Sequence, residues 1–248
     1  MKINPPNIGH SGAISKDKPP LTLEPHQFWQ AIDAPATHDS VPQGFIDSYP
    51  ATLPDGRQLL LPLRVLPGDG TEAVASLIVN QASFAVEDAL VSAMADLVAP
   101  LAPEVLVGVP TLGLPLANNL ARRLGHARMV ALGTSRKFWY RDELSAPLSS
   151  ITSPTHAKTI FLDPRSLPLL VGRRVVVVDD VISSGTSMAA VLRLLALAGI
   201  EPVAIAVAML QGNRWHSPLA ARRQKILAPL TSPRFTRAAE GRWVPVEV

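Results

Sequence analysis

The chain has 248 residues, 47% of them apolar and 17% charged, and its formal net charge at pH 7 is +3. This length and apolar content allow one sizeable domain plus an appendage and exclude global disorder. The absence of cysteine excludes disulfides, thiol nucleophiles and thiolate metal sites. The sequence has no uncharged run of about 18 residues and no charged and then apolar leader, so we expect a soluble, cytoplasmic protein without membrane contact.

The first third of the chain divides into two segments of different composition. Residues 1–43 are rich in Pro, Asp, His and Ser, which predicts an extended arm with one short helical piece over residues 25–32. Residues 44–82 hold short apolar runs separated by turn residues, which predicts a small β region that begins with a hairpin. The runs are residues 45–52, 58–66 and 75–79, and the turn between the first two is Pro54-Asp55-Gly56.

Residues 83–211 alternate between helical and strand-like apolar patterns. This alternation predicts an α/β domain with a parallel sheet flanked by helices. Between residues 134 and 156 the apolar pattern lapses. The expected helices are residues 84–99, 115–124 and a segment that begins near Met188 and that Gly199 ends; the expected strands are residues 104–109, 128–132, 159–162, 175–178 and 202–209.

Residues 174–188 carry the strongest chemical signal. Four consecutive valines predict a strand buried on both faces, and Asp179 and Asp180 follow it directly. At the carboxyl end of a parallel strand these acids reach the crevice where open α/β sheets bind ligands, and they can accept hydrogen bonds from vicinal sugar hydroxyls. The next residues, 183–187, offer hydroxyls, backbone N–H groups and Gly185 at a helix N-terminus, which suits a phosphate. The stretch therefore predicts a site for ribose beside phosphate.

This stretch resembles the phosphoribosyl-pyrophosphate (PRPP) signature of type I phosphoribosyltransferases, and the order of elements over about residues 75–211 is similar to that family. The resemblance implies the family's Rossmann-like fold, with the small N-terminal β region as a hood. It also implies that Asp179 and Asp180 hold the ribose hydroxyls and act in catalysis. The alternative is a buried strand whose acids only cap a helix. The residues implied to wrap the 5′-phosphate are Ser183, Ser184, Gly185, Thr186 and Ser187.

A second loop, residues 110–113, lies between a predicted strand and a predicted helix N-terminus, which is an anion-binding arrangement. In the family the equivalent loop holds the pyrophosphate, commonly through a strained peptide, and Thr111, Leu112 and Gly113 match it here. The surrounding run looks similar to that of orotate enzymes, which often place a lysine where Leu112 stands. The loop therefore lacks one positive charge, and its backbone N–H groups are expected to bind the anion.

The segment over residues 134–156 is long for a connection inside a compact domain, which favours a lid or a disordered insert. It resembles the mobile catalytic loop of the family, which frequently begins with Arg-Lys, here Arg136 and Lys137. These two side chains are implied to meet the negative charge that develops on pyrophosphate while the closed lid excludes water. The alternative is a surface loop whose aromatic residues pack on a neighbour.

The residues that recognise the base are the least determined by the sequence. Asn80 lies where related purine enzymes carry an Asn-His-Gln stretch, and its amide offers a donor and an acceptor to a purine edge. It can equally be a helix N-cap. Trp215, just past the last predicted strand, can stack on a base or cover the edge of the sheet.

Residues 212–248 form a basic C-terminal extension. Between residues 211 and 248 there are seven Lys or Arg residues against two Glu residues. Such a segment could meet nucleic acid or a phosphorylated substrate, although a solvated surface segment is the more common explanation. No helix-turn-helix, zinc or RNA-recognition pattern accompanies it, so we do not expect nucleic acid as a partner.

The resemblance implies an enzyme that transfers phosphoribose from PRPP to a nucleobase and releases pyrophosphate. A purine is favoured over orotate by the β region and Asn80. Magnesium is expected to bind mainly through PRPP and not at a metal site of the protein, and the family is commonly dimeric, so a homodimer is expected. The alternatives are a regulator that senses PRPP without turnover and a PRPP-dependent enzyme that acts on an amine other than a nucleobase.

Overall fold

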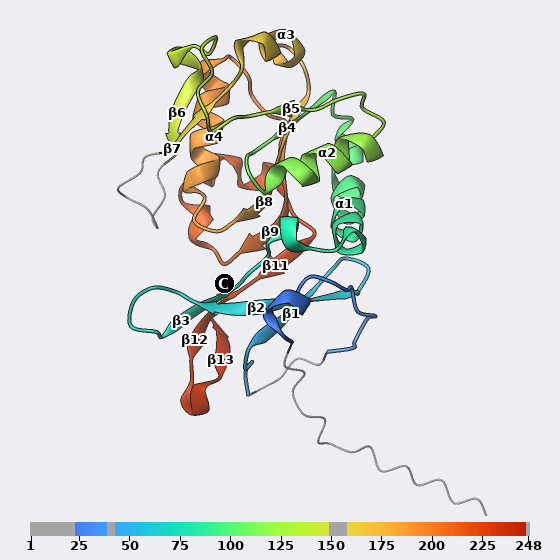
Figure 1. Cartoon of the computed structure of the whole chain (residues 1–248), viewed down its shortest axis with the longest axis vertical. Helices are drawn as coiled ribbons and strands as arrows, with labels where there is room; N and C mark the ends of the chain where they lie inside the picture. The colour runs from blue at the N-terminus through green and yellow to red at the C-terminus, as the bar shows by residue number, and fades with distance from the viewer. Residues whose placement is uncertain (1–22, 39–42, 149–157, 247–248) are drawn as a thin grey trace, which may run out of the picture.

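The computed structural model describes residues 23–38, 43–148 and 158–246. It contains a parallel sheet with helices on both faces, an antiparallel sheet drawn below it, and a two-stranded sheet to one side (Figure 1). The helices are α1 (Phe84–Val98), α2 (Gly113–Arg123), α3 (Leu167–Leu170) and α4 (Thr186–Leu197). The strands are β1 (Ser48–Thr52), β2 (Gln58–Val65), β3 (Glu72–Ala75), β4 (Val105–Gly108), β5 (Val130–Ala131), β6 (Ser145–Leu148), β7 (Lys158–Phe161), β8 (Val175–Ile182), β9 (Ala204–Gln211), β10 (Ile226–Leu227), β11 (Leu230–Ser232), β12 (Arg234–Arg237) and β13 (Trp243–Val246).

The parallel sheet confirms the predicted α/β class. Its strand order is β10-β9-β8-β4-β5, with β11 also pairing with β9, and all of these pairs are parallel. The strand with the four valines, β8, lies in the middle, where Val178 stands opposite Gly108 on one side and Ala206 on the other. One predicted strand is placed differently: β7 does not join this sheet but pairs antiparallel with β6.

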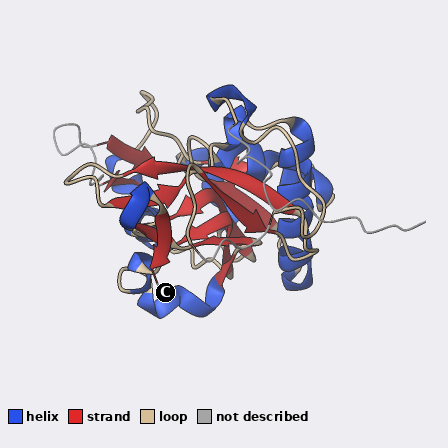
Figure 2. Ribbon diagram, turned by 90° about the horizontal axis from the view of Figure 1, so that it is seen from below, coloured by secondary structure: helices blue, strands red, loops and turns tan. Residues whose placement is uncertain are grey.

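The two faces of the parallel sheet bury alternate residues of β8, because successive side chains of a strand point to opposite sides. Val176 and Val178 pack in the core under α1 and α2, while Val175 and Val177 pack in a second core under α4. All four are fully buried, and each contributes about 1.5–3 kcal/mol relative to an exposed side chain. In Figure 2 the strands occupy the middle of the molecule and most helical turns lie outside them.

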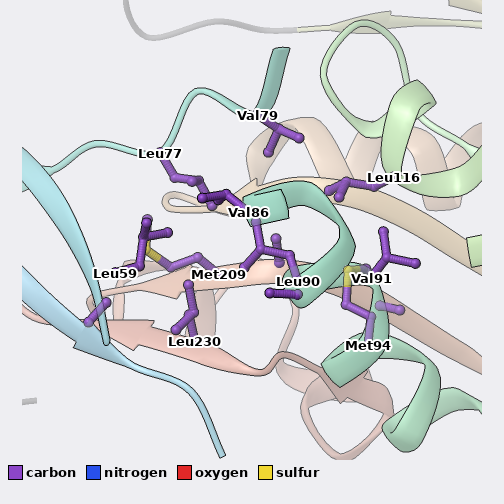
Figure 3. Close-up of a cluster of buried hydrophobic side chains, with 14 of the residues drawn as sticks. Leu59, Leu77, Val79, Val86, Leu90, Val91, Met94, Leu116, Met209 and Leu230 are labelled. Carbon is purple, nitrogen blue, oxygen red and sulfur yellow. The ribbon is translucent and has the colours of Figure 1, made fainter. Parts of the chain in front are cut away.

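Helix α1 connects the parallel sheet to the antiparallel sheet through apolar contacts. One buried cluster contains Leu90 and Met94 of this helix, Met209 of β9, Leu230 of β11 and Leu59 of β2 (Figure 3). The cluster holds the end of the parallel sheet against the antiparallel sheet, so the two sheets share one core.

The antiparallel sheet, which we call the hood, has the order β1-β2-β3-β12-β13. The predicted hairpin is confirmed by the antiparallel pairing of β1 with β2. Strand β3 ends at Ala75, the residue at which the third apolar run of the sequence begins. Leu77 and Val79, which belong to that run, are buried in the core but lie outside any strand. Strands β12 and β13 come from the other end of the chain, so both ends of the chain build the hood.

The last part of the chain is folded and is not a solvated surface segment over residues 226–246. Leu230 and Phe235 are fully buried, and Phe235 packs edge-on against the rings of Phe45 and Tyr49. The side chain of Gln211 at the end of β9 donates to the backbone oxygen of Ala75 at the end of β3, at 2.7 Å. The hood is therefore fastened to the carboxyl end of the parallel sheet. In the described ranges, no helix has the length and apolar composition that a bilayer crossing requires.

Candidate active site

The predicted ribose and pyrophosphate residues meet at the carboxyl edge of the parallel sheet. Asp179 and Asp180 lie near the end of β8, and the loop after the neighbouring strand β4 crosses directly over them. A Cβ atom at Gly113 would lie 2.8 Å from both the Cα and the Oδ1 atoms of Asp179, so only glycine fits this position. The backbone of the loop thereby touches the acidic pair, which sequence spacing alone does not show.

Asp179 is buried, Asp180 is half-buried, and neither carboxylate has a cationic side chain paired with it in the described ranges. Asp179 is 9% exposed, and its Oδ1 atom accepts a hydrogen bond from the backbone N–H of Asp180 at 2.9 Å. Burial raises the pKa of the Asp179 carboxyl group well above its ordinary value of 3.8, and the charge of Asp180 raises it further. Burial also raises the pKa of Asp180. No ion pair among the described residues involves either carboxylate, so the pair has capacity for hydroxyl donors or a cation from a ligand.

The loop after β8 places a glycine at the N-terminus of α4. Gly185 has φ of 78°, in the left-handed region that favours glycine, and it is the N-cap residue of α4. The first N–H of α4, that of Thr186, donates to the Ser184 hydroxyl at 3.4 Å, and no hydrogen bond in the described ranges joins Asp179 or Asp180 to α4, so the acids do not cap this helix. The hydroxyls of Ser184 and Thr186 lie 2.8 Å apart in this loop. The loop therefore presents hydroxyls and the N-terminus of a 12-residue helix beside the carboxylates.

The loop after β4 ends in the same kind of helix N-terminus. The peptide bond between Pro110 and Thr111 is cis, and α2 begins at Gly113. Leu112 occupies the N-cap position and offers no side-chain acceptor. The Leu114 N–H donates to the Thr111 oxygen at 3.4 Å and Pro115 has no N–H, so of the first three residues of α2 only Gly113 has an N–H without a partner in the described ranges.

The lid segment is only partly without regular structure. Its later part, Ser145–Leu148, is β6, and the tip between β6 and β7 lies outside the described residues. Arg136 pairs with Asp142 at 3.1 Å on the surface, and Lys137 is exposed. No hydrogen bond or ion pair in the described ranges joins Arg136 or Lys137 to the acidic pair. The structure therefore does not bring these two side chains into the site.

One aromatic residue of the lid packs on a neighbour, as the alternative interpretation expected. The indole N–H of Trp139 donates to Asp163 at 3.2 Å, and the guanidinium of Arg165 lies 4.5 Å from the centre of the Trp139 ring. The Arg165 side chain also donates to Asp163, and these bonds lower the pKa of the Asp163 carboxyl group to about 2. Phe138, the preceding residue, is 97% exposed.

The two residues considered for the base have different surroundings. Asn80 is exposed in a 3₁₀ helix (Val79–Gln81), and the hydroxyl of Ser83 caps α1 by accepting from the Val86 N–H. Asn80 is therefore not the N-cap of α1. Trp215 is 8% exposed and its indole N–H donates to the Gly212 oxygen, so it covers the edge of the sheet and does not present its ring to a ligand.

One basic residue at this edge was not identified from the sequence. The guanidinium of Arg214, in the turn after β9, lies 3.4 Å from the Ser183 hydroxyl in the loop after β8. The sequence held one signal for it: Arg214 comes soon after a predicted parallel strand, and the carboxyl ends of parallel strands lie at one edge of the sheet, where the ligand is expected.

The model of the phosphoribosyl transferase domain family matches residues 78–227, more than half of the chain. The chain belongs to this family. Membership places the protein among the PRPP-dependent pentosyltransferases, and its architecture is the type I phosphoribosyltransferase fold. A comparison with curated proteins found no match.

Solved structures of phosphoribosyltransferases share the fold at low sequence identity. The APRTase from Giardia lamblia complexed with 9-deazaadenine is 19% identical over 69% of this chain and 93% of that chain, with a TM-score of 0.57. The adenine phosphoribosyltransferase from Saccharomyces cerevisiae is 17% identical over 68% of this chain and 94% of that chain, with a TM-score of 0.53. At such identity the likeness concerns the fold alone.

Proposed function

We propose that the protein transfers the 5-phosphoribosyl group of PRPP to a purine base and releases pyrophosphate. The observation that carries the proposal is the close approach of Gly113 to Asp179, which supports a site where the loop after β4 and the acidic pair hold neighbouring parts of one ligand. The loop over residues 183–187 follows the pair after two intervening residues, at the end of β8. Phosphate, ribose and pyrophosphate groups follow one another in PRPP in the same order as these three features.

In this proposal each part of the site has one task. Asp179 and Asp180 accept hydrogen bonds from the ribose hydroxyls and stabilise the positive charge that the ribose gains as its bond to pyrophosphate breaks. The loop of Ser183, Ser184, Gly185, Thr186 and Ser187 holds the 5′-phosphate, and Thr111, Leu112 and Gly113 hold the pyrophosphate through their backbone. Arg136 and Lys137 approach the leaving pyrophosphate when the lid closes.

Magnesium fits this site as an ion carried by the substrate. Asp179 and Asp180 are hard oxygen donors of the kind that Mg²⁺ prefers, and they have no cation partner among the described residues. In the same ranges no group of three or more His, Cys, Asp or Glu side chains is arranged to hold a metal ion. The proposal therefore has Mg²⁺ bound mainly by PRPP oxygens, where it neutralises charge on the diphosphate.

The preference for a purine rests on the hood and on Asn80. The exposed amide of Asn80 lies just after the last N-terminal strand of the hood and offers a donor and an acceptor to a base edge. The Giardia lamblia and Saccharomyces cerevisiae proteins were crystallised with 9-deazaadenine and adenine, respectively. The proposal also includes a homodimer in the cytoplasm; the mass of the particle in solution, measured by light scattering, tests the homodimer.

The test is incubation of the purified protein with PRPP, Mg²⁺ and one base at a time. Adenine, guanine, hypoxanthine, xanthine, uracil and orotate form the panel, and nucleotide is measured by chromatography. We expect nucleotide with at least one purine. Product with orotate or uracil alone would contradict the purine assignment. PRPP binding by calorimetry without nucleotide from any base would instead favour a PRPP sensor, for which the missing lysine at Leu112 is the supporting observation.

A further inference from the structure

The 3₁₀ helix that follows β9 (Arg214–His216) begins with a positive charge beside the loop after β8. Arg214 is exposed, and its Nη2 atom lies 3.4 Å from the Ser183 Oγ atom. No carboxylate in the described ranges forms an ion pair with Arg214, whereas neighbouring Arg222 pairs with Glu201. The guanidinium is therefore beside the loop without an acidic partner to compete for it.

The backbone that carries Arg214 is fixed against this loop. Trp215 is buried, and its indole N–H donates to the Gly212 oxygen at 2.9 Å, which closes the turn. A Cβ atom at Gly185 would lie 3.1 Å from the Cα atom of Trp215, so the turn packs on the glycine of the loop. The backbone at Arg214 is therefore held close to residues 183–187, so the guanidinium can reach a ligand bound there.

We propose that Arg214 binds the 5′-phosphate of the donor and makes the protein select phosphorylated riboses. The inference rests on the proposed function, since it assigns a further residue to the same site. Residues 183–187 contain no basic side chain, and the nearby acidic pair repels a phosphate. A guanidinium presents two parallel N–H donors to phosphate oxygens, and such charge-assisted bonds are stronger than the bond to a neutral hydroxyl.

The charge balance of the site gives a second reason for this role. Because Leu112 stands where a lysine is often found, the loop after β4 (residues 110–113) has no basic side chain. This loop and residues 183–187 after β8 therefore supply only backbone and hydroxyl donors. Arg214 adds one full positive charge at the phosphate end. The donor is then held more firmly by its 5′-phosphate than by its pyrophosphate, which leaves the pyrophosphate freer to depart.

The experiment compares two fragments of the donor. Binding of ribose 5-phosphate and of Mg²⁺-pyrophosphate is measured by calorimetry for the wild type, Arg214→Gln, Arg214→Lys and the control Arg193→Gln, which changes an exposed arginine of α4 outside the site. We expect Arg214→Gln to weaken ribose 5-phosphate by about tenfold or more and pyrophosphate by less than about twofold. Arg214→Lys should recover part of the loss, because it restores the charge without the paired donors.

The outcomes separate this inference from the proposed function. If Arg214→Gln binds ribose 5-phosphate as the wild type does, or loses both ligands equally, Arg214 has no role at the phosphate while the proposed function stands. If the wild type binds neither ligand nor PRPP, the proposed function fails and the inference fails with it. Thermal unfolding of Arg214→Gln should match the wild type, because the side chain is exposed.

Discussion

The end of β8 and the lid belong to one proposed site, but they differ in how far their side chains are buried. Asp179 is buried and Asp180 half-buried in a strand that is paired on both sides, and the four valines before them are fully buried. Residues 134–139 of the lid are exposed, and Trp139 contacts Asp163 and Arg165 at the surface. In the proposal, the groups that bind the ribose are thus part of the sheet, and the groups that act on the leaving pyrophosphate are carried by a surface segment.

This difference has a physical reason. A buried carboxylate loses hydration when the sheet forms, so the sheet must hold it rigidly until a ligand compensates the charge. A lid cannot be buried in the same way, because it must open for the substrate and then exclude water. The predictions below test whether the two parts differ in this manner, and they run from the largest expected effect to the smallest.

Asp180→Asn should have the largest effect. The amide keeps the shape of the side chain but removes the negative charge that is proposed to stabilise the ribose, so we expect turnover to fall by about 100-fold or more. Burial raises the pKa of Asp180, so its charged form is disfavoured in the folded protein, and we expect the variant to unfold at the wild-type temperature or above. Steady-state kinetics and thermal unfolding measure the two effects. Wild-type turnover would refute the ribose assignment.

Lys137→Ala should act on the rate more than on binding. Because Lys137 is exposed and makes no hydrogen bond or ion pair with the acidic pair in the described ranges, we expect kcat to fall by about tenfold to 100-fold with little change in the Kd of PRPP. Arg141→Ala, an exposed arginine of the same segment, is the control and should change kcat little. A loss of PRPP affinity with unchanged kcat would show that the lid binds the ground state instead.

Asp179→Asn should stabilise the protein while it impairs function. The pKa of Asp179 is raised in the folded state, so the folded protein binds the proton more tightly and stability falls as pH rises from about 3.8 through the raised value. Asparagine does not titrate, so it removes this pH dependence. At pH values above the raised pKa, each unit by which the pKa is raised lowers the free energy of unfolding of the wild type by about 1.4 kcal/mol. Denaturant unfolding at several pH values measures it. Equal stability of the variant and the wild type at pH 7 would contradict a costly buried charge.

Asp163→Asn should have the smallest effect, confined to the lid. The pKa of Asp163 is lowered to about 2, so its contribution is present above its ordinary value of 3.8 and is lost as pH falls toward 2. Because the contact is near the surface, we expect less than about 1 kcal/mol of global stability. The emission of Trp139, taken as the difference from Trp139→Phe, should shift to longer wavelength. Asp55→Asn, in the β1–β2 turn, should leave that emission unchanged.

The sequence by itself determined the elements whose patterns are local. Four valines predicted the central strand, because a strand buried on both faces needs apolar side chains on both. The period of the helical segments and the residues that end them predicted α1, α2 and α4, and the turn at residues 54–56 predicted the first hairpin. The acidic pair and the loop after it were predicted for the same reason: they are adjacent in the chain and need no distant partner to be recognised.

Tertiary structure alone decided which distant segments meet. The contact of Gly113 with Asp179, the approach of Arg214 to Ser183 and the entry of β12 beside β3 join residues that are far apart in the chain. No local pattern encodes such pairings, because they follow from packing of whole elements and from which edge of the sheet is left to be covered. The basic C-terminal segment has the composition of a surface tail, yet its few apolar residues, Leu230 and Phe235 among them, are enough to bury it in the core and the hood.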